Sequence, residues 1–222
     1  MLTNYLKIAF RSLIRSKSHS IINILGLGIG IACCLLIVLF VKDEWTFDQF
    51  HSKADRIYRV WAREDYGKDE VFFYTVTPFP MGPTLKDNFE EVEYQVRIHN
   101  IGTQVKSGDD LFSESVTIGG QHLFKVFDFP SINGETTSAL DGANHVVLTE
   151  KMASKYFGDT DPINKVISIQ LGDQFEDFVV KSVVENIPTN SSIQFDILIS
   201  DLNYPKLYSP RALTSAWFNI TP

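Results

Sequence analysis

The chain has 222 residues, of which 44% are hydrophobic, so it can form a substantial core and is not a disordered polypeptide. It carries 20 lysines and arginines against 27 aspartates and glutamates, which gives a formal net charge of −7. This acidic balance argues against nucleic acid as a partner, because contacts to phosphates need a basic surface.

The charges are divided unevenly along the chain. Residues 1–20 contain no acid and four basic side chains, which are Lys7, Arg11, Arg15 and Lys17. Residues 42–222 hold all the acids and have a net charge of −11. No Lys, Arg, Asp or Glu occurs between Ser18 and Val41. The sequence therefore indicates a basic N-terminal segment, an apolar segment and an acidic body.

Residues 1–20 are predicted to form a basic amphipathic helix. Apolar residues recur at helical spacing, at Leu2, Leu6, Ala9 and Leu13, with Tyr5, Ile8, Phe10 and Ile14 widening the stripe. Basic residues recur every four positions on another face. This pattern suits a helix that lies on the anionic inner leaflet of a membrane, and it suits equally a helix packed beside other membrane segments. The candidate contacts to the membrane surface or to a cytoplasmic partner are Lys7, Arg11, Arg15 and Lys17.

Residues 21–41 are predicted to form a transmembrane helix. Fourteen of these 21 residues are Leu, Ile, Val or Phe, and Asn23 is the one strongly polar side chain. A helix of this length spans about 31 Å, close to the hydrocarbon thickness of a bilayer. A cleavable signal peptide has a shorter apolar region that ends in small residues, and a buried helix of a soluble protein is rarely apolar on all sides. By the positive-inside rule, residues 1–20 are cytoplasmic and residues 42–222 lie outside.

Small residues follow one side of this predicted membrane helix. Gly26 and Gly30 form a G-x-x-x-G pair, and Cys33 or Cys34 extends the same side. Such a side lets another helix approach closely, so these four residues are candidates for helix packing. Both cysteines of the chain lie here, so the outer body depends on its hydrophobic core rather than on disulfides.

The outer body, residues 42–222, is predicted to be an α+β domain. Strands are expected at 57–63, 92–99, 111–118, 145–149, 166–171 and 175–184, and short helices at 83–89, 121–127 and 150–157. Gly172 and Asp173 predict a hairpin between the last two strands. Single helices interspersed with hairpins are typical of the α+β class. The many phenylalanines of this body are expected in its core.

The sequence contains no catalytic or metal-binding motif that we can identify. The five histidines are scattered, and His51 could meet Asp48 and Asp55 only if that segment were helical. The Gly-x-Ser-x-Gly and Walker A patterns are absent. We therefore expect that the chain is not an enzyme and has no catalytic, metal-binding or cofactor-binding residues of its own.

The membrane helix continues into the outer body without a flexible linker. Between Gly30 and Thr77 the sequence has no proline, and Gly67 is its one glycine. A flexible tether would be rich in Gly and Ser. The composition thus favours a stiff connection that can transmit rigid-body movement.

Several runs of residues resemble one family of membrane proteins. Residues 4–44, FDQFH at 47–51 and DRIYRV at 55–60 are similar to the start of MacB-like and FtsX-like ABC transporter permeases, particularly the long versions common in Bacteroidetes. Further runs resemble their periplasmic core domain; these are VLTE at 147–150, KYFG at 155–158, DPI at 161–163 and the residues from Val183 to Ser191. Asn164 stands where the family usually has Gly. The resemblance covers nearly the whole chain.

The resemblance implies a function in the cell (inner) membrane. Such a permease passes from its first membrane helix into a large periplasmic domain, returns through three further helices and forms a homo- or heterodimer. A separate cytoplasmic ATPase binds the ATP, and movement of the outer domain serves export or mechanotransmission. The acidic body would then meet a substrate or an extracytoplasmic partner. Because this chain has one predicted span, we expect it to be an N-terminal fragment of a permease.

Two other functions are compatible with parts of the sequence. A single-span, membrane-anchored binding or sensor module needs one span and one outer domain, which is what the sequence predicts. A membrane-anchored hydrolase would need a nucleophile or metal constellation, and the sequence offers none.

Overall fold

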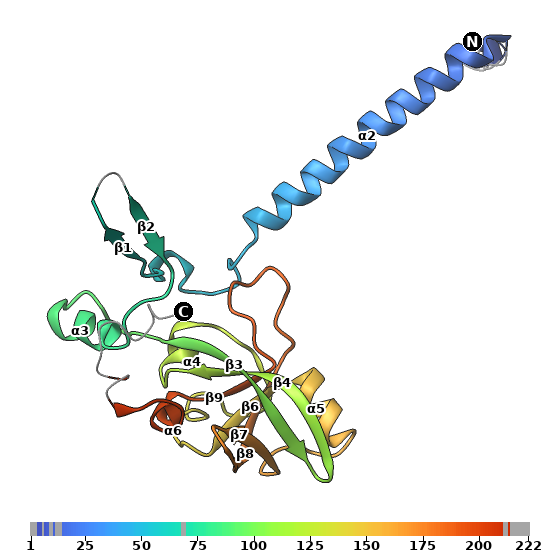
Figure 1. Ribbon diagram of the computed structural model, residues 1–222. Helices are drawn as coiled ribbons and strands as arrows, with labels where there is room; N and C mark the ends of the chain where they lie inside the picture. Colours follow the sequence, from blue (N-terminus) through green and yellow to red (C-terminus); the bar gives the residue numbers. More distant parts are fainter. Residues whose placement is uncertain are drawn as a thin grey trace. The chain divides into compact units, whose positions relative to one another are not determined.

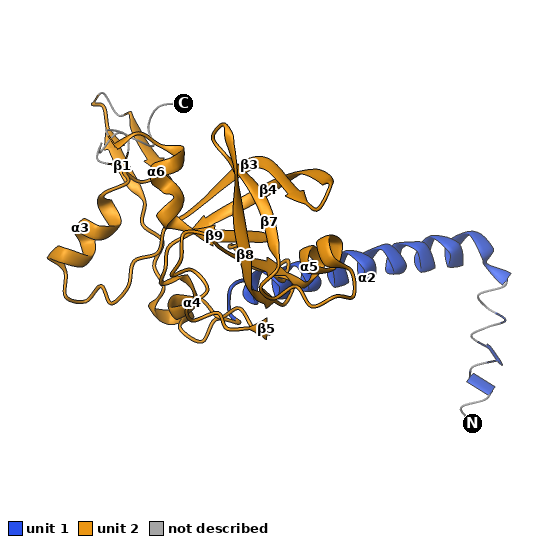
Figure 2. Cartoon of the chain, turned by 90° about the horizontal axis from the view of Figure 1, so that it is seen from below, with its two compact units in different colours: residues 1–49 blue, residues 50–222 orange. Residues whose placement is uncertain are grey.

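The computed structural model describes residues 4–5, 7–8, 11, 15–67, 70–210 and 213. The chain divides into two compact units, residues 1–49 and residues 50–222 (Figure 2). The first unit contains the long helix α2, Lys17–Trp45 (Figure 1). The second, which we call the outer unit, contains the described strands and the shorter helices.

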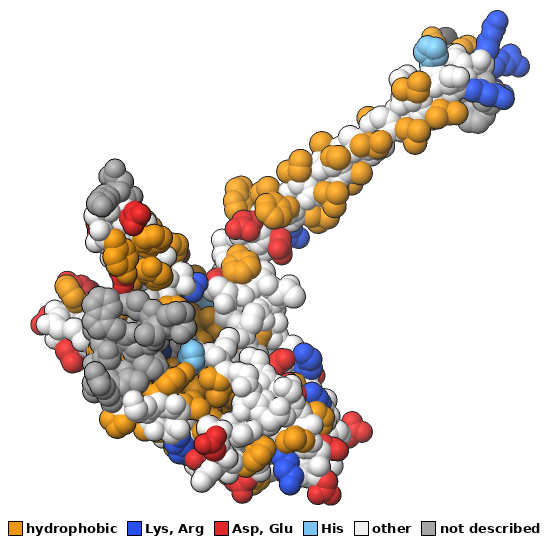
Figure 3. Space-filling model, in the orientation of Figure 1, with side chains coloured by type: hydrophobic (Ala, Val, Ile, Leu, Met, Phe, Trp, Pro, Cys, Tyr) orange, Lys and Arg blue, Asp and Glu red, His pale blue; other side chains and the backbone are white. Residues whose placement is uncertain are grey.

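Helix α2 is hydrophobic on all its sides. Its 29 residues extend about 44 Å, and none of its side chains is buried. Figure 3 shows hydrophobic side chains along its whole length. A helix that is apolar all round needs an apolar surrounding, either a protein core or a membrane. By length and composition α2 can cross a membrane, and it exceeds the predicted span of 21–41 by four residues at each end.

The outer unit is a mixed α/β structure. Its strands are β1 (Ala62–Asp65), β2 (Val71–Tyr74), β3 (Ile98–Ser107), β4 (Asp110–Gly119), β5 (Ser131–Gly134), β6 (His145–Thr149), β7 (Val166–Leu171), β8 (Gln174–Val184) and β9 (Ile197–Ser200). Its helices are α3 (Met81–Asn88), α4 (Leu123–Val126), α5 (Glu150–Phe157) and α6 (Tyr204–Leu207), with 3-10 turns η1 (Ala54–Arg56) and η2 (Asp201–Asn203). The predicted α+β class is confirmed.

The main sheet closes on itself. Its strand order is β5-β8-β6-β9-β4-β3-β7, and β7 also pairs with β8, so six strands form a ring with β5 on its outside. Strand β8 makes this possible because its first half pairs antiparallel with β7 while its second half pairs parallel with β6. Strands β1 and β2 form a separate two-stranded antiparallel sheet.

The central strands β6 and β9 are buried on both faces. In β6, Val146 and Leu148 belong to one hydrophobic cluster, and Val147 between them belongs to a second. Strand β9 divides in the same way, with Leu198 in the second cluster. Because side chains alternate along a strand, the two clusters occupy opposite faces of the sheet. Helix α5 contributes to the first cluster and α4 to the second, which explains why three consecutive residues in each of these strands are apolar.

Most of the predicted elements in the second half of the chain are confirmed. Strands β4, β6, β7 and β8 lie within one residue of their predicted bounds, and α5 matches residues 150–157. The β7–β8 hairpin turns at Gly172, which has φ +64. Helices α3 and α4 form where 83–89 and 121–127 were predicted, although α3 begins at Met81 and α4 spans only four residues.

Two predicted strands were wrong. The segment 57–63 is irregular up to residue 61, because β1 finds its partner β2 only from Ala62 onward. The segment 92–99 becomes a strand only at Ile98. Just before it, the guanidinium of Arg97 lies 3.5 Å from the ring centroid of Phe79 and donates a hydrogen bond to the carbonyl oxygen of Phe79. The pairing with β4 ends here, with a last backbone hydrogen bond from the N–H of Gly120 to the carbonyl oxygen of Arg97.

The turns after α5 explain two runs of residues noted in the sequence. Gly158 follows the helix with φ +58, a conformation that L side chains rarely adopt. Asn164 has φ +62, and asparagine tolerates the left-handed region better than other residues with a side chain. The replacement of the usual glycine by Asn164 is therefore compatible with the turn.

Candidate functional site

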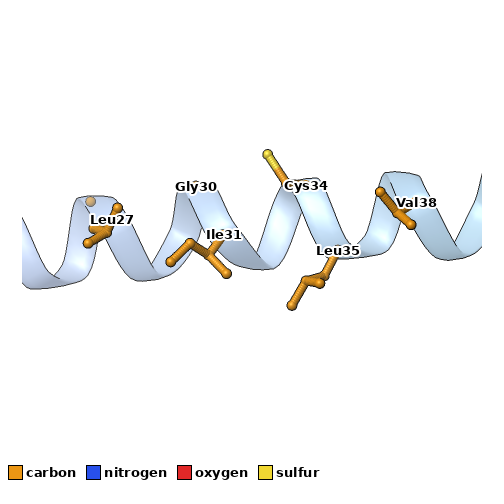
Figure 4. A pocket seen from close by; sticks show the side chains of 7 residues that line it. Leu27, Gly30, Ile31, Cys34, Leu35 and Val38 are labelled. Atoms are coloured by element: carbon orange, nitrogen blue, oxygen red, sulfur yellow. The ribbon is translucent and has the colours of Figure 1, made fainter.

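One side of α2 carries a shallow groove in which small residues alternate with larger apolar ones (Figure 4). It is lined by Gly26, Leu27, Gly30, Ile31, Cys34, Leu35 and Val38. Gly26, Gly30 and Cys34 share this side because they are spaced four residues apart. Cys33, which was grouped with them from the sequence, does not line the groove.

No contact within the described chain requires glycine in this groove. A methyl group added at Gly26 or Gly30 would have no neighbour within 4 Å. Glycine in a helix interior nevertheless costs about 1 kcal/mol relative to alanine. The glycines make sense if another helix approaches this side, because their lack of a side chain lets the two backbones come close. We keep helix packing as a proposal for Gly26, Gly30, Cys33 and Cys34.

The basic residues of the N-terminal segment are all exposed. Lys7, Arg11 and Arg15 are helical, and Lys17 is the first residue of α2. Tyr5 and Ile8 from the predicted apolar stripe are exposed as well. The rest of that stripe, Leu2, Leu6, Ala9, Phe10, Leu13 and Ile14, lies outside the described residues.

Helix α2 ends in a hydrogen-bonded turn. The backbone N–H of Thr46 donates to the carbonyl oxygens of Lys42 and Asp43, and its hydroxyl also donates to Asp43. The N–H of Gln49 then donates back to the carbonyl oxygen of Thr46, 3.3 Å away. Asp48 adopts φ +57 within this turn. The chain therefore leaves the helix in a defined conformation although no glycine is present.

The first residues of the outer unit are tied to the loop that follows α4. His51 is only 4% exposed, and its Nδ1 accepts a hydrogen bond of 3.0 Å from the backbone N–H of Asp128. In return, the carboxylate of Asp128 accepts a hydrogen bond from the backbone N–H of Ser52. The ammonium of Lys53 donates to the carbonyl oxygen of Lys125. We call residues 51–53 together with residues 125–129 the His51 anchor.

Aromatic rings hold the imidazole of this anchor. The ring of Phe50 lies 4.1 Å from the His51 ring, centroid to centroid, and those of Phe127 and Phe129 lie at 5.2 and 5.4 Å. The latter two meet it edge to face, the geometry that aromatic pairs prefer. Phe129 is buried in the second hydrophobic cluster, with Phe195 at 5.1 Å. The anchor is therefore continuous with the core of the outer unit.

The electrostatics of the anchor follow from these contacts. The backbone N–H of Ser52 stabilises the ionised carboxylate and lowers the pKa of Asp128 below its usual value. The side chain of Ser52 and the charge of Lys53 lower this pKa further, while burial acts in the opposite direction. The carboxylate is thus charged across the neutral pH range and remains an acceptor for Ser52.

A comparison with protein families identifies the outer unit. The family model of the MacB-like periplasmic core domain matches residues 20–221. The chain belongs to this family. Membership assigns residues 20–221 to a family of periplasmic core domains. Together with the apolar helix α2, it indicates a membrane-anchored protein with an extracytoplasmic domain.

A solved structure supports the same fold, and two others are similar to parts of the chain. A domain assigned to a permease protein from Porphyromonas gingivalis has 21% sequence identity and a TM-score of 0.56, over 70% of this chain and 64% of that one. The periplasmic region of MacB from Actinobacillus actinomycetemcomitans has 19% identity and a TM-score of 0.40, over 55% and 54% of the two chains. The extracellular domain of the ABC-type transporter YknZ from Gram-positive bacteria has 17% and 0.36, over 46% and 51%. This chain thus covers less than two thirds of each structure. None of the curated proteins matches the sequence.

The family resemblance in the sequence included the run FDQFH, and the structure gives its last residue a role. His51 was considered as a metal ligand with Asp48 and Asp55, whereas its Nδ1 binds the Asp128 amide. In the described part of the chain, no group of three or more His, Cys, Asp and Glu residues could hold a metal ion. The anchor was not foreseen, since His51 and Asp128 are 77 residues apart.

The expectation that the phenylalanines are core residues holds only in part. Phe129, Phe178 and Phe195 are buried. In contrast, Phe72 and Phe73 of β2 are 46% and 63% exposed. The two-stranded sheet of β1 and β2 therefore presents aromatic surface to its surroundings.

Proposed function

We propose that the chain is the membrane subunit of an ABC transporter of the MacB/FtsX type. A separate cytoplasmic ATPase would bind and hydrolyse ATP, and the outer unit would move in response, for export or mechanotransmission. One observation carries this proposal: a helix long and apolar enough to cross a membrane is followed directly by a MacB-like periplasmic core domain. A domain of this family attached to such a helix suits a protein that works on both sides of a membrane.

The charge distribution supports an orientation with the N-terminus in the cytoplasm. Four exposed cations precede or begin α2, which are Lys7, Arg11, Arg15 and Lys17. Each basic residue near an anionic leaflet contributes about 1 kcal/mol of attraction. These residues would contact inner-leaflet lipid or the ATPase. The groove at Gly26, Gly30 and Cys34 would pack against another membrane helix, of this permease or of a partner permease in a homo- or heterodimer.

The proposal can be tested by purification and by labelling in sealed cells. The full chain, tagged and extracted from its native membrane in mild detergent, should bring with it an ABC ATPase that mass spectrometry identifies. A membrane-impermeant thiol reagent should label Ser154→Cys, which is exposed on α5, and should spare Tyr5→Cys, which is exposed in the N-terminal segment. Both variants need Cys33 and Cys34 replaced by Ala. Labelling of Tyr5→Cys and not of Ser154→Cys would refute the orientation.

A second function fits one feature of the structure. The described residues contain one helix that could cross a membrane, as a single-span anchored binding or sensor module requires. Such a module would be recovered from the membrane intact and without an ATPase. The purification above therefore decides between the two proposals.

A further inference from the structure

We infer that the His51 anchor is the point at which movement of the membrane helix enters the outer unit. The inference rests on the proposed function and names the residues that would carry its mechanical step. The connection between α2 and the outer unit is short, since only residues 46–49 separate the end of α2 from Phe50. Four residues span at most about 14 Å when fully extended. The hydrogen bond from Gln49 to Thr46 shortens this turn further, so it has little slack to absorb a displacement.

In the segment that follows this turn, residues 50–61, His51 makes the buried contact with the rest of the outer unit. Of residues 50–61, all of which the structure describes, His51 alone is buried. The ion pair of Arg56 with Glu93 also holds the segment, but its side chains are 72% and 58% exposed. Exposed ion pairs contribute little, because water and salt screen them. A force on the segment is therefore resisted mainly at His51.

The two hydrogen bonds of the anchor are reciprocal. The side chain of His51 binds the backbone of the loop at Asp128, and the side chain of Asp128 binds the backbone of the segment at Ser52. Hydrogen bonds depend steeply on distance and angle. Neither main chain can slide along the other without breaking both bonds, so the segment and the loop move together.

From the loop, the path continues into the sheet. Phe129 packs in the second hydrophobic cluster with Val147 of β6, Val184 of β8 and Leu198 of β9. Close-packed cores resist compression and transmit strain. A displacement at His51 thus reaches β8, β6 and β9, which are neighbours in the closed sheet. The last residue of the run FDQFH is, on this inference, a positioning residue for the mechanical step.

The test uses the full chain in lipid nanodiscs and needs neither ATP nor a partner protein. Hydrogen exchange reports the amides of Ser52 and Asp128, and a nitroxide at Ser154→Cys, with Cys33 and Cys34 replaced by Ala, reports the reorientation of the outer unit on the nanosecond timescale. His51→Ala should speed exchange at both amides by about tenfold, as expected for the loss of a net hydrogen bond, and should increase the amplitude of reorientation. Amides of β6 and β9 should keep their protection.

Three further variants separate the contributions. His51→Asn keeps an acceptor near the position of Nδ1 and should restore slow exchange at Asp128, whereas His51→Phe keeps a ring without an acceptor and should not. Arg56→Ala removes the exposed ion pair of the same segment and should change neither measurement. If His51→Ala loses protection throughout the sheet, the comparison of His51→Asn with His51→Phe provides the test.

The outcomes distinguish this inference from the proposed function. Unchanged reorientation in His51→Ala or His51→Phe, despite faster exchange at Asp128, would overturn the anchor as the point of transmission and leave the transporter proposal standing. Suppose instead that His51→Ala increases reorientation but the native chain brings no ATPase with it from its membrane. The anchor would then stand, and the transporter proposal would be overturned. Equal exchange in His51→Asn and His51→Phe would also contradict the inference, because it makes the hydrogen bond irrelevant.

Discussion

A flexible insertion after Glu44 should uncouple the outer unit from the membrane helix. In the native chain, the end of α2 is fixed by the hydrogen bonds of Thr46 to Lys42 and Asp43. Nine Gly and Ser residues inserted there form a flexible coil with a root-mean-square length of about 16 Å. Helix shifts in switching proteins are about 1–2 Å, and one-turn movements about 5 Å. The slack thus exceeds the expected displacement several-fold, and transmission should be almost completely lost.

The assay follows the height and orientation of the outer unit above the membrane. A donor dye at Ser154→Cys, with Cys33 and Cys34 replaced by Ala, transfers energy to acceptor dyes in the lipid headgroups of a nanodisc that holds the permease with its ATPase. In the native sequence, ATP should change this transfer. In the insertion variant, the ATP-dependent change should fall below about a tenth of the native value, while the assembly continues to hydrolyse ATP.

A control insertion tests whether the effect depends on the position. The same nine residues placed after Gly108, in the exposed turn between β3 and β4, leave the sequence of the connection unchanged and should leave the ATP-dependent change intact. Membrane insertion and the yield of folded protein should match in both variants. An unaltered ATP-dependent change in the variant after Glu44 would refute the reasoning, because a coil with this much slack cannot pass on a small displacement.

Three further predictions concern single residues. Gly30→Leu fills the groove on α2 and should lower the recovery of the permease assembly from membranes, whereas Gly28→Leu, which replaces a glycine outside the groove, should not. Asn164→Ala should cost about 1 kcal/mol in urea unfolding of the full chain in detergent, because φ +62 disfavours a Cβ, and Asn164→Gly should be close to neutral. The lowered pKa of Asp128 contributes stability above the unfolded value of about 3.9, and this contribution is lost as the pH falls through the lower folded pKa. Asp128→Asn should therefore reduce the loss of stability between pH 5 and pH 2 in the same unfolding measurement, taken at about half-unit pH steps.

The sequence analysis predicted most accurately the elements whose ends are determined by residues close to them in the sequence. Helix α5 begins after Thr149 and ends before Gly158, whose left-handed conformation stops it. Strands β7 and β8 are separated by the turn at Gly172. In each case, the residues that set the boundary lie within the element or beside it, so a short window of sequence contains the information.

The elements that it missed depend on distant partners. Strand β9 is only four residues long, and it is a strand because it pairs in parallel with β4 and antiparallel with β6. Such a short apolar run has no periodicity that separates strand from helix. The segment before β3 shows the opposite case, because its sequence pattern is strand-like but its pairing with β4 begins only at Ile98, opposite Gly119.

The groove on α2 and the His51 anchor also differ in how far they could be predicted from local sequence. The groove on α2 could be read from the spacing of Gly26, Gly30 and Cys34, since a helix brings residues at four-residue spacing to one side. No local rule predicts that His51 meets Asp128, because the loop after α4 comes to it through the fold. The sequence offered one signal, a histidine among aromatics in FDQFH, and spacing alone could not assign it. A short connection transmits movement only if its far end is held, and the reciprocal hydrogen bonds of the His51 anchor supply that hold.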